Sequence, residues 1–156
     1  MARGLFVEAG TDFKGRDALV EACKMLPDGV LCLLTALAYH EMTTQLARSV
    51  WIAVPRGRAA PMRKHLPLHI VRFSGAALTE GVEVREVNGA TIRVYNPAKT
   101  VADCFKYRNT IGLDVALEAL RDYWHKRLGT LEELEHYAAI CRVAKVIRPY
   151  IESLVV

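Results

Sequence analysis

The sequence lacks the roughly 18–20 uninterrupted apolar residues that a membrane-spanning helix requires, because Thr35 interrupts its longest apolar stretch, Val30–Tyr39. The N-terminal residues Met1–Gly4 are not followed by the apolar segment of a secretory signal. Glycine and proline are few, at 10 and 6 of 156 residues, whereas 52% of the residues are hydrophobic. This composition excludes disordered, collagen-like and low-complexity chains. It predicts a folded cytoplasmic protein with one main domain.

Cysteine is scarce and widely spaced. None of the four cysteines belongs to a C-x-x-C pair, so zinc sites, redox motifs and a disulfide framework lack support. The surrounding sequence is mostly apolar, which favours free buried thiols in a reducing compartment. We therefore expect no bound metal and reduced thiols at Cys23, Cys32, Cys104 and Cys141.

The usual catalytic motifs are missing as well. The sequence contains no glycine-rich phosphate loop and no G-x-S-x-G nucleophile elbow. A metal-dependent nuclease needs clustered carboxylates, but Glu83 and Glu86 fall on opposite faces of their predicted strand. His40, at the end of an apolar helical segment, is better explained as a cap or a packed ring than as a base. We predict a protein that is not an enzyme, with no cofactor and no small-molecule substrate.

Acidic residues are absent from one quarter of the chain. Residues 42–79 contain six basic residues and no Asp or Glu. Their charge of +6 exceeds the net charge of the whole chain, which is +4. Most of them are arginines, which pair with carboxylates or phosphates in a bidentate manner. The segment Pro55–Pro67 reads as a loop, so these charges favour contact with nucleic acid or with an acidic protein; a solvated loop without a partner is the alternative. The candidate binding residues are Arg48, Arg56, Arg58, Arg63, Lys64 and Arg72.

Hydrophobic periodicity predicts a small mixed sheet in the first two thirds of the chain. Asn88-Gly89 lies between two alternating segments, which is the strongest local signal for a β-hairpin. The helical patterns cover residues 16–26 and 30–40, the second as a helix or a strand-to-helix unit. The predicted strands cover residues 5–8, 50–54, 69–73, 82–87 and 91–95.

The remainder of the chain has helical patterns. Asn96 is a natural N-cap with Pro97 at the first helical position, and Lys99 can pair with Asp103 one turn later. Thr130 and Glu133 form a capping box, and Pro149 predicts a kink or a restart in the last helix. Leu113, Ala116, Leu117, Leu120 and Trp124 are the expected core face of the helix before the capping box. The fold class is α/β (α+β), with a mixed sheet flanked by helices and a helical C-terminal part.

Four segments resemble the AbiEi family of antitoxins. They are LPDGVLCLLTALAYHEMTTQLARSVWIAVPRG, IVRFSGAALTEGVE, VYNPAKTVADCFKYRNTIGLDVALEALRDY and CRVAKVIRPYIESL, and the run Asn96–Lys106 is the most distinctive part. The family comprises antitoxins and transcriptional regulators of type IV toxin–antitoxin systems, which act in abortive infection and phage defence. The resemblance implies an N-terminal winged helix-turn-helix that binds operator DNA. It further implies a C-terminal domain that neutralises a nucleotidyltransferase toxin and assists autoregulation.

Only part of that organisation is expected in this chain. The segment ARGLFVEAG resembles the last strand of the wing, so residues 1–14 are expected to be its remnant and residues 15–156 the antitoxin domain. DNA binding at an operator is expected only where a complete winged helix is present. The alternatives are a nucleic-acid-binding regulator acting through the basic segment 48–72 and, less favoured, a nuclease-like enzyme. The positions that match the family, with a mainly architectural role expected and Ser74 capping a short helix, are Ser74, Gly75, Thr79, Asn96, Pro97, Lys99, Thr100, Asp103 and Lys106.

Overall fold

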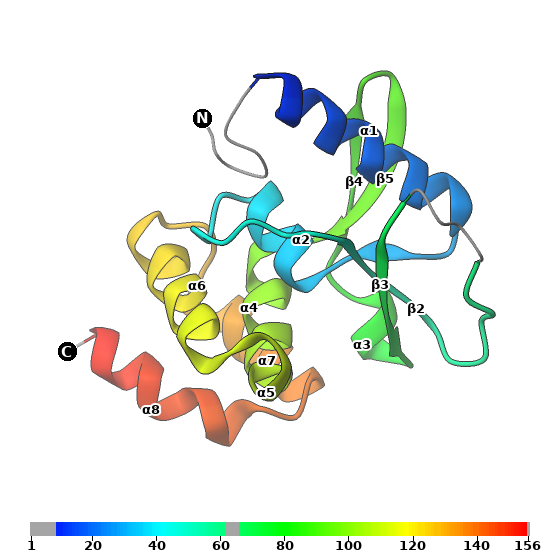
Figure 1. Ribbon diagram of the computed structural model, residues 1–156. Helices are drawn as coiled ribbons and strands as arrows, with labels where there is room; N and C mark the ends of the chain where they lie inside the picture. The colour runs from blue at the N-terminus through cyan, green and yellow to red at the C-terminus, as the bar shows by residue number, and fades with distance from the viewer. Residues whose placement is uncertain (1–8, 62–65, 156) are drawn as a thin grey trace.

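Figure 1 shows the computed structural model, which describes the backbone of residues 9–61 and 66–155 and the side chains of residues 15–61 and 66–155. The strand predicted over residues 5–8 and the candidate residues Arg63 and Lys64 lie outside the described residues. The helices are α1 (Ala9–Met25), α2 (Leu33–Tyr39), α3 (Ala76–Thr79), α4 (Pro97–Lys106), α5 (Arg108–Ile111), α6 (Leu113–His125), α7 (Leu131–Ile140) and α8 (Ala144–Val155). The strands are β1 (Val30–Leu31), β2 (Val50–Pro55), β3 (Leu68–Phe73), β4 (Val82–Val87) and β5 (Ala90–Tyr95).

The described strands form one mixed sheet in the order β3-β2-β1-β5-β4. β2 and β3 are parallel over six residue pairs, and β4 and β5 form an antiparallel hairpin. These two halves meet at β1, which is antiparallel to β2 and parallel to β5. β1 is only two residues long, so the backbone pairing between the halves is short: Val30 and Leu31 pair with their neighbours, and the Cys32 amide donates to the Trp51 carbonyl at 3.0 Å.

Helices cover both faces of the sheet, as Figure 1 shows for α1 on one side and the C-terminal helices on the other. Alternate residues of β2 point to opposite faces because the side-chain period of a strand is two. Ile52 packs with Leu19 of α1, whereas Ala53 packs with α2 and the C-terminal helices. The second of these two cores is the larger and contains five of the ten residues of α4. The α/β fold class and the helical C-terminal part are therefore confirmed.

The turn and cap signals in the sequence correspond to the observed geometry. Asn88 and Gly89 have φ angles of 52° and 78°, the left-handed conformations that the tight turn between β4 and β5 requires. Asn96 caps α4 by accepting a hydrogen bond from the Lys99 amide at 2.8 Å. Thr130 and Glu133 form both hydrogen bonds of the predicted capping box at the start of α7.

Three helical expectations need correction. α1 begins at Ala9, seven residues before the helical pattern predicted from Arg16. Of the face predicted for α6, Ala116 and Leu120 are buried, but Leu113 is exposed. The other buried residues of this helix are Val115, Ala119 and Tyr123. The apolar residues of this helix extend around more than one stripe, and packing against α4 decides which stripe is buried.

The third correction concerns Pro149, where the sequence predicts a kink or a restart of the last helix, and the restart is the part that is wrong. α8 continues through Pro149 without a restart, and the proline is exposed. Because its nitrogen carries no hydrogen, the proline removes one helical hydrogen bond while the rest of the helix keeps its packing through Ile147 and Ile151. Among the described residues, no helix is long and apolar enough to cross a membrane.

Candidate functional site: an arginine patch and a buried ion pair

The fold brings three of the candidate basic residues together and separates a fourth from them. Arg56 and Arg58 follow the end of β2, and Arg72 lies near the end of β3. Arg48 precedes the start of β2, whose two ends lie about 17 Å apart because the strand rises roughly 3.3 Å per residue. We call Arg56, Arg58 and Arg72 the arginine patch.

The patch forms because β2 and β3 are parallel, so that their carboxyl ends lie at the same edge of the sheet. Val54 pairs in register with Arg72, which places the residues after β2 beside those after β3. Arg72 Nη2 donates a hydrogen bond to the Arg58 carbonyl oxygen at 2.9 Å, and Arg56 Nε donates to Ser74 Oγ at 3.5 Å. The Arg72 guanidinium thus contacts the backbone that follows β2, and the Arg56 guanidinium contacts a side chain that follows β3.

One of the three charges is partly compensated. Arg58 Nη1 forms a salt bridge to Asp28 Oδ2 at 3.2 Å, with the two side chains 37% and 41% exposed. In the described part of the chain, it is the only salt bridge of the patch. Asp28 belongs to the turn before β1. It lies outside residues 42–79, so the charge count over that segment could not reveal its salt bridge with Arg58. Arg56 and Arg72 are exposed and leave the patch with a net positive charge.

An aromatic residue that the sequence did not single out borders the patch. Tyr107 stacks on Phe73 at the end of β3, with ring centroids 5.7 Å apart. Burial and the nearby Asp103 carboxylate raise the pKa of Tyr107, and the positive charge of Arg56 opposes this rise. Arg56 therefore lies close enough to Tyr107 to affect its ionisation, and the phenol remains protonated at neutral pH.

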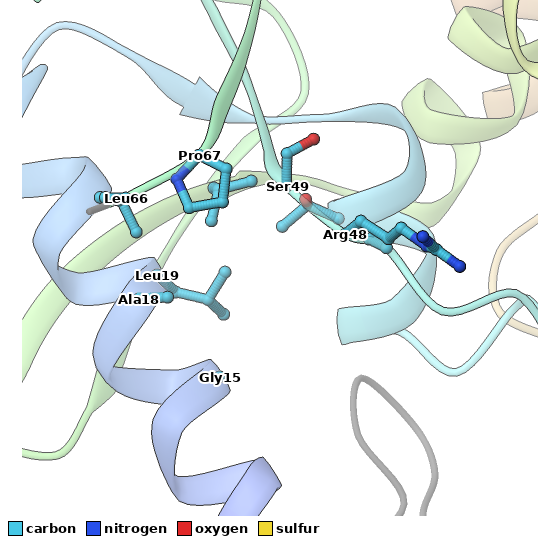
Figure 2. Close-up of a pocket in the computed structure, with 10 residues that line it drawn as sticks. Gly15, Ala18, Leu19, Arg48, Ser49, Leu66 and Pro67 are labelled. Atoms are coloured by element: carbon cyan, nitrogen blue, oxygen red, sulfur yellow. The ribbon is translucent and has the colours of Figure 1, made fainter. Parts of the chain in front are cut away.

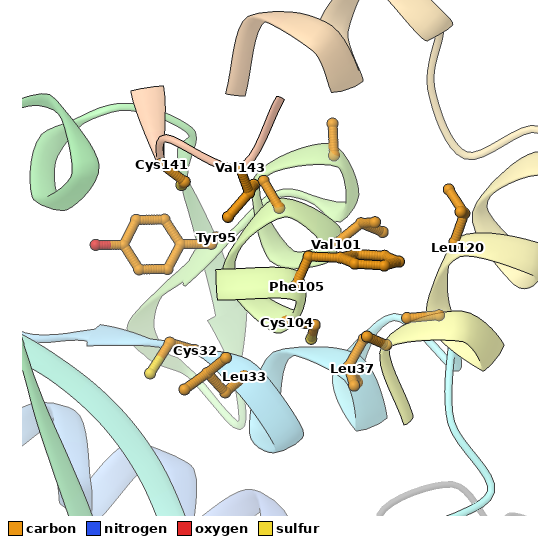
Figure 3. Packing of buried hydrophobic residues seen from close by; sticks show 14 of the residues in the cluster. Cys32, Leu33, Leu37, Tyr95, Val101, Cys104, Phe105, Leu120, Cys141 and Val143 are labelled. Atoms are coloured by element: carbon orange, nitrogen blue, oxygen red, sulfur yellow. The ribbon is translucent and has the colours of Figure 1, made fainter. Parts of the chain in front are cut away.

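The most distinctive part of the family-like sequence, Asn96–Lys106, folds into the centre of the larger core. Figure 3 shows Val101 and Phe105 of α4 among buried side chains from α2 and α6 and from the turn between α7 and α8. Every residue of α4 from Ala98 to Phe105 is buried, including the charged pair Lys99 and Asp103.

The predicted pairing of Lys99 with Asp103 is confirmed, and the pair has almost no exposed surface. Lys99 Nζ contacts the two Asp103 carboxylate oxygens at 2.9 and 2.8 Å, and its side chain is 0% exposed. The same ammonium lies over the Tyr95 and Phe73 rings, 3.8 and 4.8 Å from their centroids. Carboxylate oxygens and aromatic faces thus surround the buried cation, which lowers the cost of removing it from water.

The carboxylate partner is held by a third group. Cys141 Sγ donates a hydrogen bond to Asp103 Oδ1 at 3.3 Å. Burial raises the pKa of the Asp103 carboxyl, while the Lys99 ammonium and the Cys141 hydrogen bond offset part of that rise. Burial also raises the pKa of Cys141 to about 12, so this thiol stays protonated and acts as a donor. The cluster links α4 to the end of α7.

Further family-like positions have structural contacts. Asn96 Nδ2 donates to the Tyr137 hydroxyl at 3.2 Å, and Thr100 Oγ1 donates to the Tyr95 carbonyl at 3.3 Å. Pro97 occupies the start of α4, as predicted. Lys106, at the end of the helix, is exposed.

The expected cap of α3 is wrong. Gly75, not Ser74, is the N-cap of α3, and no side chain caps this helix. Gly75 has a φ angle of 59°, which turns the chain sharply into α3 and leaves Ser74 beside Arg56. Thr79 Oγ1 donates to the Gly75 carbonyl at 3.3 Å. Ser74 therefore belongs with the arginine patch.

Within the described residues, no group of three or more His, Cys, Asp or Glu side chains is arranged to hold a metal ion. No protein-family model matches the chain, and no curated protein is significantly similar to it in sequence.

Proposed function

We propose that this protein is a cytoplasmic, antitoxin-type binding protein of a type IV toxin–antitoxin system. In this role it counters a nucleotidyltransferase toxin and contributes to transcriptional autoregulation, and it is not an enzyme. The proposal rests on the resemblance of its sequence segments to the AbiEi family together with the location of their polar residues in the fold.

The observation that carries the proposal is the complete burial of Lys99 and Asp103. These are the residues of the family-like sequence whose chemistry most suggests catalysis, yet they contact each other, two aromatic rings and a thiol. A pair that is 0% and 2% exposed has no surface left for a substrate. Its role is to build the fold, and partner recognition is left to residues on the surface.

The arginine patch is the surface that best suits such recognition. Its guanidinium groups are held at one edge of the sheet, so little side-chain freedom is lost when a partner binds. An acidic protein surface offers the carboxylates that arginine binds in bidentate geometry. We therefore propose direct contact between the patch and an acidic surface of the toxin.

Co-expression with the neighbouring toxin gene tests this function. Wild-type protein should restore growth of cells that express the toxin. Charge reversal by Arg56→Glu with Arg72→Glu should impair that rescue, whereas Arg121→Glu with Arg148→Glu, at exposed positions on α6 and α8, should leave it intact. If the wild-type protein fails to rescue growth, the proposed function is wrong. If the two double variants rescue growth equally well, the arginine patch does not take part in binding the toxin.

The alternative, contact with nucleic-acid phosphates, predicts a different result. Binding of promoter DNA would then fall with salt, and each lost phosphate contact would reduce the salt slope by about one. We expect only weak binding that does not distinguish promoter from scrambled DNA. Tight and sequence-selective binding by this chain would favour the regulator over the toxin-binding protein.

A further inference from the structure

Arg48, which the fold separates from the arginine patch, lies at a pocket on the opposite edge of the sheet. The pocket has a volume of about 160 Å³, is partly open to solvent and is bounded by the side of α1, the start of β2 and the segment before β3. Figure 2 shows Leu19, Leu66 and Pro67 gathered around this hollow, while the guanidinium of Arg48 extends away from them. The pocket thus has an apolar interior, with Arg48 at its mouth and the guanidinium directed away from the interior.

The lining is almost entirely apolar. Ala18 and Leu19 of α1 line the pocket, as do Ala47 before β2 and Val50 at the start of that strand. The hydroxyl of Thr35, a further lining residue, already accepts a hydrogen bond from the Trp51 amide at 2.8 Å. An apolar cavity of roughly 150 Å³ is large enough to bind benzene, so the interior fits a single ring or a short branched chain.

Arg48 at the mouth of the pocket favours a ligand with a negative charge. Arg48 is exposed, and no acidic residue occurs within residues 42–79 of the sequence. An arginine side chain has several rotatable bonds, so its guanidinium can turn to meet a carboxylate held at the mouth. Ser49, which also lines the pocket, is a second polar group at this position.

We propose that this pocket binds a small monocarboxylate with an apolar body of about the size of a benzene ring. The body fills the space between α1 and β2, and the carboxylate pairs with Arg48. This site is independent of the proposed toxin contact, because the arginine patch lies at the other end of β2.

Nuclear magnetic resonance titration with three probes tests the proposal. Benzoate carries both features of the ligand, benzene only the ring and acetate only the charge. Millimolar benzoate and benzene should shift the amide resonances of Leu19, Thr35 and Val50, and acetate at the same concentration should not. Absence of shifts with benzoate, or equal shifts with acetate, would overturn the proposal.

Variants separate the interior from the mouth. Ala18→Leu and Ala47→Leu fill the pocket from two different segments, α1 and the residues before β2, and each should abolish binding of both ring compounds. Two fillers keep the test valid if one of them disturbs folding. Arg48→Gln should weaken benzoate about fivefold, the effect of an exposed ion pair, while benzene binding is unchanged. The matched control Arg121→Gln should change neither affinity.

Two results would contradict the assignment. Benzoate binding that survives in both pocket-filling variants would place the ligand elsewhere on the protein. An Arg48→Gln variant that loses benzene and benzoate equally would show that Arg48 supports the pocket wall and does not recognise a carboxylate.

Discussion

Replacing Lys99 with methionine is the most informative perturbation of the fold. Methionine is about as long as lysine and fills its space, but it removes the only cation that contacts Asp103 in the described part of the core. The carboxylate then remains buried with the Cys141 thiol as its hydrogen-bond donor. The variant therefore isolates the electrostatic contribution with little change in packing.

The expected cost is large because both side chains are almost fully buried. Removing one partner of a buried ion pair destabilises proteins by about 3–5 kcal/mol. Folded domains are stable by about 5–15 kcal/mol, so Lys99→Met should remove a substantial part of the free energy of unfolding. Replacing both residues, Lys99→Met with Asp103→Leu, should recover most of this loss, since apolar side chains of similar volume require no charge compensation.

The loss should also depend on pH. Without the Lys99 ammonium, the folded-state pKa of Asp103 rises further above its unfolded value. A carboxyl with a raised folded-state pKa binds its proton more tightly in the native state, so stability falls as the pH increases from the unfolded pKa through the folded pKa. The destabilisation by Lys99→Met should therefore be smaller at acidic pH than at neutral pH.

Urea unfolding followed by circular dichroism, at acidic and neutral pH, measures these effects. Arg85→Met is the matched control, because Arg85 pairs with Glu83 on the exposed edge strand β4, and this change should cost less than about 1 kcal/mol. A Lys99→Met variant no less stable than Arg85→Met would refute the reasoning. So would a double variant as unstable as the single one.

Three further predictions follow from local geometry. Gly81→Ala should destabilise by about 3 kcal/mol in urea unfolding, because Gly81 has a φ of 83° and an added Cβ would lie 2.8 Å from the Lys99 Cβ; a neutral substitution would contradict this packing. Thr130→Ala should cost about 1 kcal/mol by removing the cap of α7, and thermal melting would show whether it does. Iodoacetamide at neutral pH should modify Cys23 first, as mass spectrometry would show. Burial raises the pKa of all four cysteines, and Cys23 is the least buried of them. Rapid labelling of a second thiol in the folded protein would refute this. The three thiols expected to react only after unfolding are Cys32, Cys104 and Cys141.

The features that local rules govern could be predicted from the sequence. The Asn88-Gly89 turn, the Asn96 cap and the Thr130 capping box each depend on a few neighbouring residues, and each has the expected geometry. The pairing of Lys99 with Asp103 also follows from helical spacing alone. Its burial does not, because it depends on Phe73 and Cys141, which are distant in sequence.

For the candidate binding residues too, the sequence predicts what depends on neighbouring residues and not what depends on distant ones. The sequence shows which residues are basic, but the parallel pairing of β2 with β3 places Arg56 and Arg72 at the same end of the two strands and Arg48 at the other end. The salt bridge of Arg58 to Asp28 spans 30 residues, and no charge count within one window can detect it. Long-range pairing therefore decides which charges of this segment act together.

The two-residue strand β1 has a consequence for how the molecule unfolds. Within the described residues, the backbone link between the two halves of the sheet is short: three residue pairs, Val30 with Ala53, Leu31 with Ile52 and Leu31 with Val94, and the hydrogen bond from the Cys32 amide to the Trp51 carbonyl. The halves are held mainly by side chains that pack across this junction, from α1 on one face and from α2 and α4 on the other. Cooperativity between the halves therefore depends on helix packing more than on the sheet ladder. A core substitution that loosens these helices should let β2–β3 exchange its amide hydrogens independently of β4–β5, so that one domain behaves as two folding units.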